Sequence, residues 1–190
     1  LCVHRKPHVH EGLKLQLRRT AVVTTATSGD TALEILESSA PFHVIISDMR
    51  MPGMSGAELL RHARERYPDA TRMLLTGQSD LDSAISAVNE GQVFRFLTKP
   101  CPPAALQMSV AQAARQHALV TAERVLLEQT LRGAIRTLTE VLALSHPIAF
   151  GRSTRIRKTA VSLAKRLGIQ SHWHIEVAAM VSQLGWVSLP

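Results

Sequence analysis

The sequence predicts an α/β fold, in which residues 1–118 form a doubly wound parallel sheet of five strands with a helix after each strand. Two observations predict it. Short runs rich in β-branched residues alternate with amphipathic stretches along the first hundred residues. Two of these runs, 42–47 and 72–76, are almost purely apolar, as expected for strands that helices cover on both faces. A chain that is 45% hydrophobic also has enough apolar material for a core.

The predicted strands alternate with recognisable helix starts. The strands are 1–3, 21–26, 42–47, 72–76 and 93–98. Proline is favoured in the first turn of a helix, which places the start of the first helix at Pro7. Ser55 with Glu58 forms a capping box, and Ser79 with Asp82 makes a similar start. Gly91 stands where the residue after a helix end belongs.

A long helix is predicted after Lys99. "PCPP" begins it, and the chain from 104 to about 145 contains no proline and one glycine. Its apolar residues recur at spacings of three and four: Leu127, Leu131, Ala134, Leu138 and Val141. This stripe either pairs with a helix of a second copy, giving a homodimer, or packs within its own domain. Two shorter helices, 153–167 and 174–184, are expected to follow.

Charge and composition exclude several classes of protein. The net charge is +7, and much of the excess lies between Arg152 and Arg166, where a solvated helix face is commoner than a nucleic-acid footprint. No apolar run is long enough to cross a bilayer, so we expect no membrane partner. Cys2 and Cys101 form neither a disulfide framework nor a metal-binding spacing. We therefore expect a cytoplasmic protein.

Reactive side chains gather where the predicted strands end. In open α/β sheets, ligands bind at the carboxyl ends of the strands. Those ends carry His4 and Arg5, then Asp48, Thr76 and Lys99. A lone Asp at a strand end is often only a turn or cap residue, but the next helix already has its own cap.

Three motifs resemble the receiver domain of two-component response regulators, which has a flavodoxin-like fold. They are "SDMRMPGMSG" (47–56), "MLLTGQ" (73–78) and "FRFLTKP" (94–100), and the resemblance covers residues 1–118. It implies phosphorelay signal transduction, in which a sensor histidine kinase phosphorylates Asp48. It also implies that Thr76 and Lys99 bind the phosphoryl group and that Phe96 is the switch residue. The residue types suit this chemistry, because a carboxylate is a nucleophile while a hydroxyl and an ammonium stabilise the transferred charge.

One position departs from the receiver pattern. Receivers carry an acidic pair after the first strand that holds Mg²⁺, whereas this chain has His4 and Arg5. Mg²⁺ needs oxygen ligands, and only Asp48 and the backbone carbonyl of Arg50 remain. We therefore expect weak metal binding and an atypical, or phosphorylation-independent, receiver. Either Arg5 pairs with Asp48 in the metal's place, or the site has decayed.

The three histidines near the N-terminus do not predict a transition-metal site. If Pro7 begins the first helix, His8 and His10 lie on different faces of it, so they cannot join His4 around one ion.

The end of the chain resembles the start of the HD superfamily. The likeness is closest to HD-GYP modules, which hydrolyse cyclic di-GMP and follow receivers. It rests on "STRI" (153–156) and "AAMVSQLG" (178–185). Such modules bind metals through a His and a later His-Asp pair, but Arg152, Ser182 and Gln183 stand at those positions. Two-metal hydrolysis needs those ligands, so we expect no enzyme activity.

The predicted organisation is a receiver (1–118), a connecting helix (119–145) and a partial, degenerate HD-like module (146–190) with a non-catalytic output role. Two alternatives stay open. One is a fragment of a receiver-controlled cyclic di-GMP phosphodiesterase. The other is a DNA-binding transcriptional regulator with a helix-turn-helix, which the all-apolar run 177–181 disfavours because a recognition helix needs a polar face.

Overall fold

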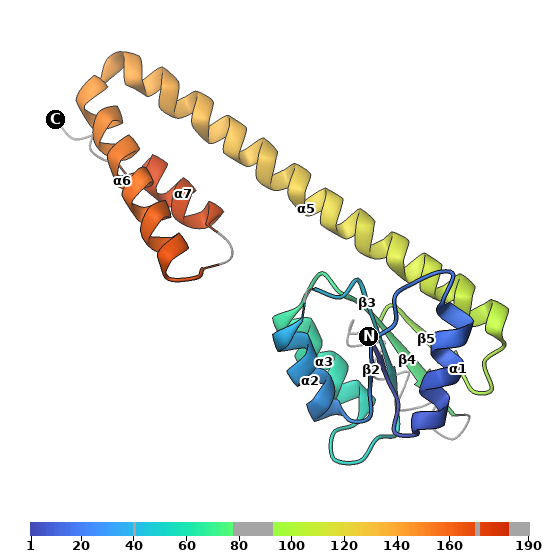
Figure 1. The fold of residues 1–190 in the computed structure, drawn as a ribbon. Coiled ribbons are helices and arrows are strands. Elements are labelled where there is room, and N and C mark those ends of the chain that lie inside the picture. The colour runs from blue at the N-terminus through green and yellow to red at the C-terminus, as the bar shows by residue number, and fades with distance from the viewer. Residues whose placement is uncertain (40, 78–92, 170–171, 183–190) are drawn as a thin grey trace. The chain divides into compact units, whose positions relative to one another are not determined.

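The computed structural model describes residues 1–39, 41–77, 93–169 and 172–182. Those residues belong to two units, Leu1–Thr121 and Ala122–Pro190, called here the N-terminal and C-terminal units (Figure 1). The predicted helix start at Ser79 and Asp82, and the predicted helix end at Gly91, lie outside the described residues.

The N-terminal unit contains the predicted five-stranded parallel sheet. Its strand order is β2-β1-β3-β4-β5, and each neighbouring pair is parallel. The strands are β1 (Cys2–Val3), β2 (Thr25–Ala26), β3 (Val44–Asp48), β4 (Thr71–Thr76) and β5 (Arg95–Thr98). β2 is shorter than the predicted run 21–26, since Val22 is 98% exposed and β2 has a single neighbour at the edge of the sheet.

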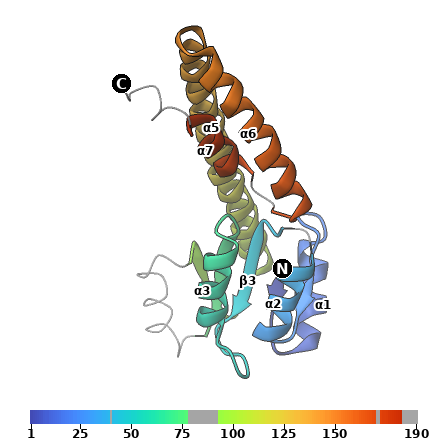
Figure 2. The ribbon, with the colours of Figure 1, turned by 90° about the vertical axis from the view of Figure 1, so that its left-hand side faces the viewer.

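Helices cover both faces of this sheet, as predicted. α2 (Gly29–Ser38) and α3 (Gly56–Arg66) lie on the face that Figure 2 presents, and α1 (Pro7–Leu17) and the start of α5 (Pro103–Ser145) lie on the other. Each face has its own apolar core. Leu59 and Leu60 belong to the first core, and Leu17 and Leu106 to the second. A sheet covered in this way leaves its strand ends as the place for a site.

The start of α3 confirms the predicted capping box. The Ser55 hydroxyl accepts a hydrogen bond from the Glu58 backbone N–H at 3.2 Å, while the Ser55 N–H donates to the Glu58 carboxylate at 2.8 Å. The preceding turn has Gly53 at a φ of +76°, a region that glycine tolerates best. Local hydrogen bonds therefore fix where this helix begins.

The C-terminal unit contains only helices among its described residues. α5 is one helix of 43 residues that contributes to both units, and α6 (Pro147–Arg166) and α7 (Trp173–Val181) pack on each other. α6 begins at Pro147 rather than at the predicted residue 153, because proline fits the first turn of a helix and does not interrupt it. Within the described part of the chain, no helix is long and apolar enough to cross a membrane.

Gly56 lets α3 approach the end of β3, which gives a test of the fold. A Cβ built at residue 56 lies 2.0 Å from the backbone oxygen of Asp48, a contact that a flexible side chain cannot relieve. We expect Gly56→Ala to lower the free energy of unfolding by about 2–3 kcal/mol, measured by urea denaturation.

The matched control is Gly12→Ala in α1, where nothing lies within 4 Å of the added Cβ. That variant should gain about 0.5–1 kcal/mol because alanine favours helix. Equal effects of the two substitutions would contradict the close approach.

Candidate functional site

Asp48 is a buried carboxylate at the carboxyl end of β3. The residue is 5% exposed, and its neighbour Ser47 is fully buried. The chain after Asp48 is held in place from two sides. The Met49 N–H donates to the Leu75 carbonyl of β4 at 2.8 Å, and the Gly56 N–H donates to the Met49 carbonyl at 3.0 Å. The sheet and the start of α3 therefore position Asp48 together.

Two nitrogen atoms face the Asp48 carboxylate, one at each oxygen. Lys99 Nζ lies 2.6 Å from Oδ1, and His4 Nε2 lies 3.3 Å from Oδ2. The two nitrogens are 3.1 Å apart. Lys99 follows β5 and His4 follows β1, and these two strands lie on opposite sides of β3 in the sheet. Side chains from both sides therefore converge on the end of β3. The carboxylate charge is balanced by residues of the chain itself.

The hydrogen bonds around His4 define how its ring contacts Asp48. The backbone N–H of Lys6 donates to His4 Nδ1 at 3.1 Å, so the neutral ring carries its proton on Nε2. Nε2 lies 3.3 Å from Asp48 Oδ2 and 3.1 Å from Lys99 Nζ. Burial, and next the nearby Lys99 ammonium, lower the pKa of the His4 imidazole from its ordinary value, although Asp48 opposes them. His4 is therefore neutral at pH 7, and Lys99 carries the balancing charge.

The His10 side chain holds the backbone of His4 in place. His10 is 6% exposed, and its Nε2 lies 2.7 Å from the His4 carbonyl oxygen. His8 is exposed, so these two histidines of α1 lie on different faces, as predicted. Sequence reasoning missed the contact between His10 and His4. The available signal was that His10 precedes Leu13 and Leu17 at the spacing of the buried helix face.

The expectation that Arg5 pairs with Asp48 is wrong. Arg5 is exposed and forms no ion pair with Asp48 in the described part of the chain, where His4 takes that place. The chain bends at Arg5, after β1 has ended at Val3. His4 points toward Asp48 as the chain leaves β1, whereas Arg5 points toward solvent.

The other predicted site residues lie at the same edge of the sheet. Thr76 is fully buried at the end of β4, and its hydroxyl donates to the Gly77 carbonyl at 3.1 Å. The Lys99 N–H donates to the Thr76 carbonyl at 2.8 Å, which ties the ends of β4 and β5 together. Phe96 of β5 is half-buried against the core under α2 and α3. The three strand ends thus bring Asp48, Thr76 and Lys99 to one place.

The residues at this edge do not fit Mg²⁺. Both Asp48 oxygens already contact a nitrogen atom, and the other expected ligand is the backbone carbonyl of the exposed Arg50. Mg²⁺ requires several oxygen ligands in octahedral geometry and does not accept an ammonium in its shell. Among the described residues, no group of three or more His, Cys, Asp or Glu side chains is placed to hold a metal.

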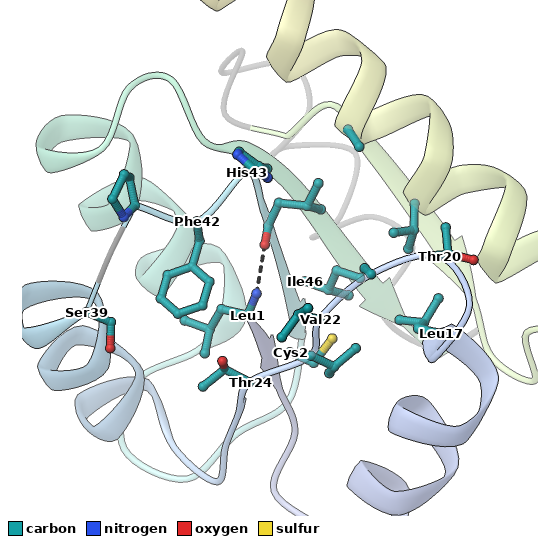
Figure 3. Close-up of a pocket in the computed structure, with 16 residues that line it drawn as sticks. Leu1, Cys2, Leu17, Thr20, Val22, Thr24, Ser39, Phe42, His43 and Ile46 are labelled. Atoms are coloured by element: carbon teal, nitrogen blue, oxygen red, sulfur yellow. Dashed lines mark hydrogen bonds between the residues drawn. The ribbon is translucent and has the colours of Figure 1, made fainter.

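A cavity of about 500 Å³ lies at the opposite end of the sheet (Figure 3). It is bordered by Leu1 and Cys2 at the start of β1 and by Phe42 and His43 before β3. The N-terminal ammonium of Leu1 donates to the Val44 carbonyl beside it at 2.9 Å. Since Asp48 is at the other end of β3, this cavity is separate from the candidate site.

The positions expected for HD metal ligands are only partly described. Arg152 lies in α6, and Ser182 follows α7 and is exposed. Gln183 lies outside the described residues. Neither a guanidinium nor a serine hydroxyl is a typical ligand of a catalytic metal pair.

Comparisons with known proteins agree with the fold of the N-terminal unit. Residues 1–111 match the family model described as "Response regulator receiver domain". The chain is 30% identical over 162 residues to the hydrogenase transcriptional regulatory protein HoxA of Cupriavidus necator, covering 85% of this chain and 31% of that protein. The chain thus spans about a third of that relative's length.

Two similar solved structures agree on the fold. One is described as adenylate cyclase from Rhodopirellula baltica. It is 43% identical with a TM-score of 0.65, and the match covers 66% of this chain and 93% of that one. The other is the signal receiver domain of an HD domain-containing protein from Pseudomonas fluorescens Pf-5. It is 32% identical with a TM-score of 0.57, covering 62% of this chain and 94% of that one. This chain therefore belongs to the response regulator receiver family of two-component systems.

Proposed function

We propose that this protein transmits a phosphorelay signal through Asp48, in a receiver whose carboxylate contacts Lys99 and His4 instead of a bound metal. The observation that carries the proposal is the pair of contacts at Asp48, 2.6 Å to Lys99 and 3.3 Å to His4. Receivers are phosphorylated by sensor histidine kinases, so the proposed partner is such a kinase.

Each residue at the edge of the sheet has a chemical role in this proposal. Asp48 is the nucleophile, and one of its oxygens has to leave His4 or Lys99 before it can attack a phosphoryl donor. The Lys99 ammonium then neutralises charge on the transferred group. The Thr76 hydroxyl turns from the Gly77 carbonyl toward that group, and Phe96 changes its packing in response. The nitrogen contacts make the resting carboxylate a poor nucleophile, so phosphoryl transfer is slow.

For the C-terminal unit we propose a non-catalytic, HD-like output. The support is the likeness in 153–156 and 178–185, together with the resemblance of the receiver to one that belongs to an HD domain-containing protein. Arg152 and Ser182 stand where metal ligands are needed, which leaves the unit a role in recognition.

A second candidate is the signalling part of a longer transcriptional regulator. Its support is the similarity to HoxA, a hydrogenase transcriptional regulatory protein, with which the chain aligns over 162 residues. The two candidates differ in what the full-length protein contains. Retention of that protein on promoter DNA favours this second reading, and its absence favours the HD-like output.

The apolar stripe of α5 supports self-association. Leu127, Leu131, Leu138 and Val141 are between 43% and 68% exposed, and their spacing places them on one face of the helix. A continuous exposed stripe of this kind favours pairing with another helix over solvation. We propose that the occupant is the same stripe of a second copy, because each helix presents the face that the other needs.

Magnesium sensitivity tests the metal-free site. The parent protein should unfold at the same temperature with and without millimolar Mg²⁺, and acetyl phosphate should label it slowly at Asp48. Replacing His4→Asp should place a second carboxylate beside Asp48, because His4 is the residue of this pair that contacts it. Mg²⁺ at about ten times its Kd should then stabilise this variant by about 1.4 kcal/mol, and labelling should quicken.

Two controls accompany that measurement. Arg5→Asp alone should stay insensitive to Mg²⁺, because Arg5 is exposed and does not contact Asp48. Asp48→Asn should remove labelling from every background. A parent protein that Mg²⁺ stabilises through Asp48, or a label that survives Asp48→Asn, is incompatible with the proposal.

Cyclic di-GMP should not be hydrolysed by this chain, because Arg152, Ser182 and Gln183 cannot bind a metal pair. The measurement is chromatography of the nucleotide after incubation with protein and either Mn²⁺ or Mg²⁺. Turnover that a chelator abolishes would reject the non-catalytic assignment.

Leu131→Glu or Leu138→Glu should shift the protein toward monomer, since each places a charge in the apolar stripe. Sedimentation velocity measures the change. Leu126→Glu is the matched control, because Leu126 is 66% exposed on the same helix but lies outside the stripe. Unchanged sedimentation of both stripe variants counts against self-association through α5.

A further inference from the structure

Glu176 of α7 forms ion pairs with arginines of two other helices of the C-terminal unit. The Arg157 guanidinium of α6 donates to Glu176 Oε1 at 3.1 Å. Arg132 of α5 places Nη2 3.7 Å from Oε2, which is an ion pair beyond hydrogen-bond distance. The Glu176 side chain is 22% exposed. Two guanidinium groups therefore lie beside one carboxylate. The Arg132 guanidinium does not donate a hydrogen bond to Glu176.

Glu176 and Arg157 together form a wall shared by two cavities. One cavity, of about 330 Å³, is also lined by Arg132, Arg136 and Glu140. The other, of about 360 Å³, is also lined by Lys158 and Lys165. Each has the size of a pocket that binds a small molecule.

The two cavities carry more positive than negative charge. Arg136 forms an ion pair with Glu140 at 2.9 Å. Glu176 forms ion pairs with both Arg132 and Arg157. Lys158 and Lys165 form no ion pair with any residue that the structure describes. Five cationic side chains thus face two carboxylates. A ligand with several negative charges would complete the balance.

We propose that these two cavities form a binding site for a small ligand that carries two or more phosphate groups. Phosphate fits because its oxygens accept paired hydrogen bonds from a guanidinium and carry more charge than the Glu176 carboxylate that occupies the place now. More than one phosphate fits because the cations are divided between the cavities. Phe150 and Met180 line the first cavity and provide an apolar surface for an organic group such as a base.

The shape favours a small ligand over a nucleic-acid strand. Arg157 and Glu176 are partly buried in the wall between the cavities, whereas a duplex is held by side chains that protrude from a surface. This inference does not depend on phosphorylation of Asp48, which lies in the N-terminal unit.

Isothermal titration of the full chain with pyrophosphate and with ADP tests the site. Arg157→Ala and Lys165→Ala should each weaken pyrophosphate binding at least tenfold. Glu176→Gln should strengthen it about tenfold, because the amide keeps the shape of the carboxylate but no longer competes as an anion. ADP should bind at least as tightly as pyrophosphate.

Arg124→Ala is the matched control. It removes the same charge from α5 outside both cavities, so affinity should stay within twofold of the parent. Circular dichroism checks that each variant is folded, and the exposed Lys165 provides a variant with little structural effect. The proposal is overturned if neither compound binds, if Glu176→Gln weakens binding, if Arg124→Ala weakens it as much as Lys165→Ala, or if duplex DNA alone binds.

Discussion

The contact between the buried Asp48 carboxylate and Lys99 is the interaction on which the N-terminal unit depends. A carboxylate that is 5% exposed costs several kcal/mol to remove from water unless an opposite charge and hydrogen bonds compensate it. Lys99 provides the charge at 2.6 Å from one carboxylate oxygen, and the His4 ring nitrogen Nε2 lies 3.3 Å from the other. Lys99 follows β5 and His4 follows β1. The contacts that compensate the Asp48 carboxylate therefore also hold the ends of those strands near the end of β3.

The compensation at Asp48 differs in kind from a bound metal. An ion in solution can leave or enter, so a metal site responds to the surrounding concentration of that ion. Lys99 and His4 are attached to the chain. The backbone N–H of Lys6 and the His10 side chain hold His4 in place. The carboxylate is therefore positioned by the fold, and His4 connects it to His10 of α1.

The C-terminal unit repeats the pairing of a carboxylate with two nitrogen groups, but in a different environment. Glu176 is more exposed than Asp48, and its two partners are both permanent cations. Water and a competing anion can reach such a carboxylate more easily, so its contacts are weaker and can be exchanged. The buried pair suits a structural and chemical role, and the accessible pair suits recognition of a ligand.

Local signals in the sequence were sufficient for much of this fold. The Ser55 and Glu58 capping box needed only residues that are three apart, and the parallel sheet followed from the alternation of apolar runs and helices. Asp48, Thr76 and Lys99 were singled out because each stands where a strand ends and within a motif that resembles those of receiver domains. The start of α6 was misplaced, since a proline suggests a break unless one knows that a helix begins there.

The sequence by itself determined which residue types reach the carboxyl edge of the sheet, because strand ends and motifs are local. Only the tertiary structure decided that His4, and not Arg5, contacts Asp48, since this depends on the direction in which the chain leaves β1. It also decided that His10 supports His4 and that Glu176 meets Arg132 and Arg157. Spacing along a chain does not specify such contacts, because they form only after separate helices and strands have packed.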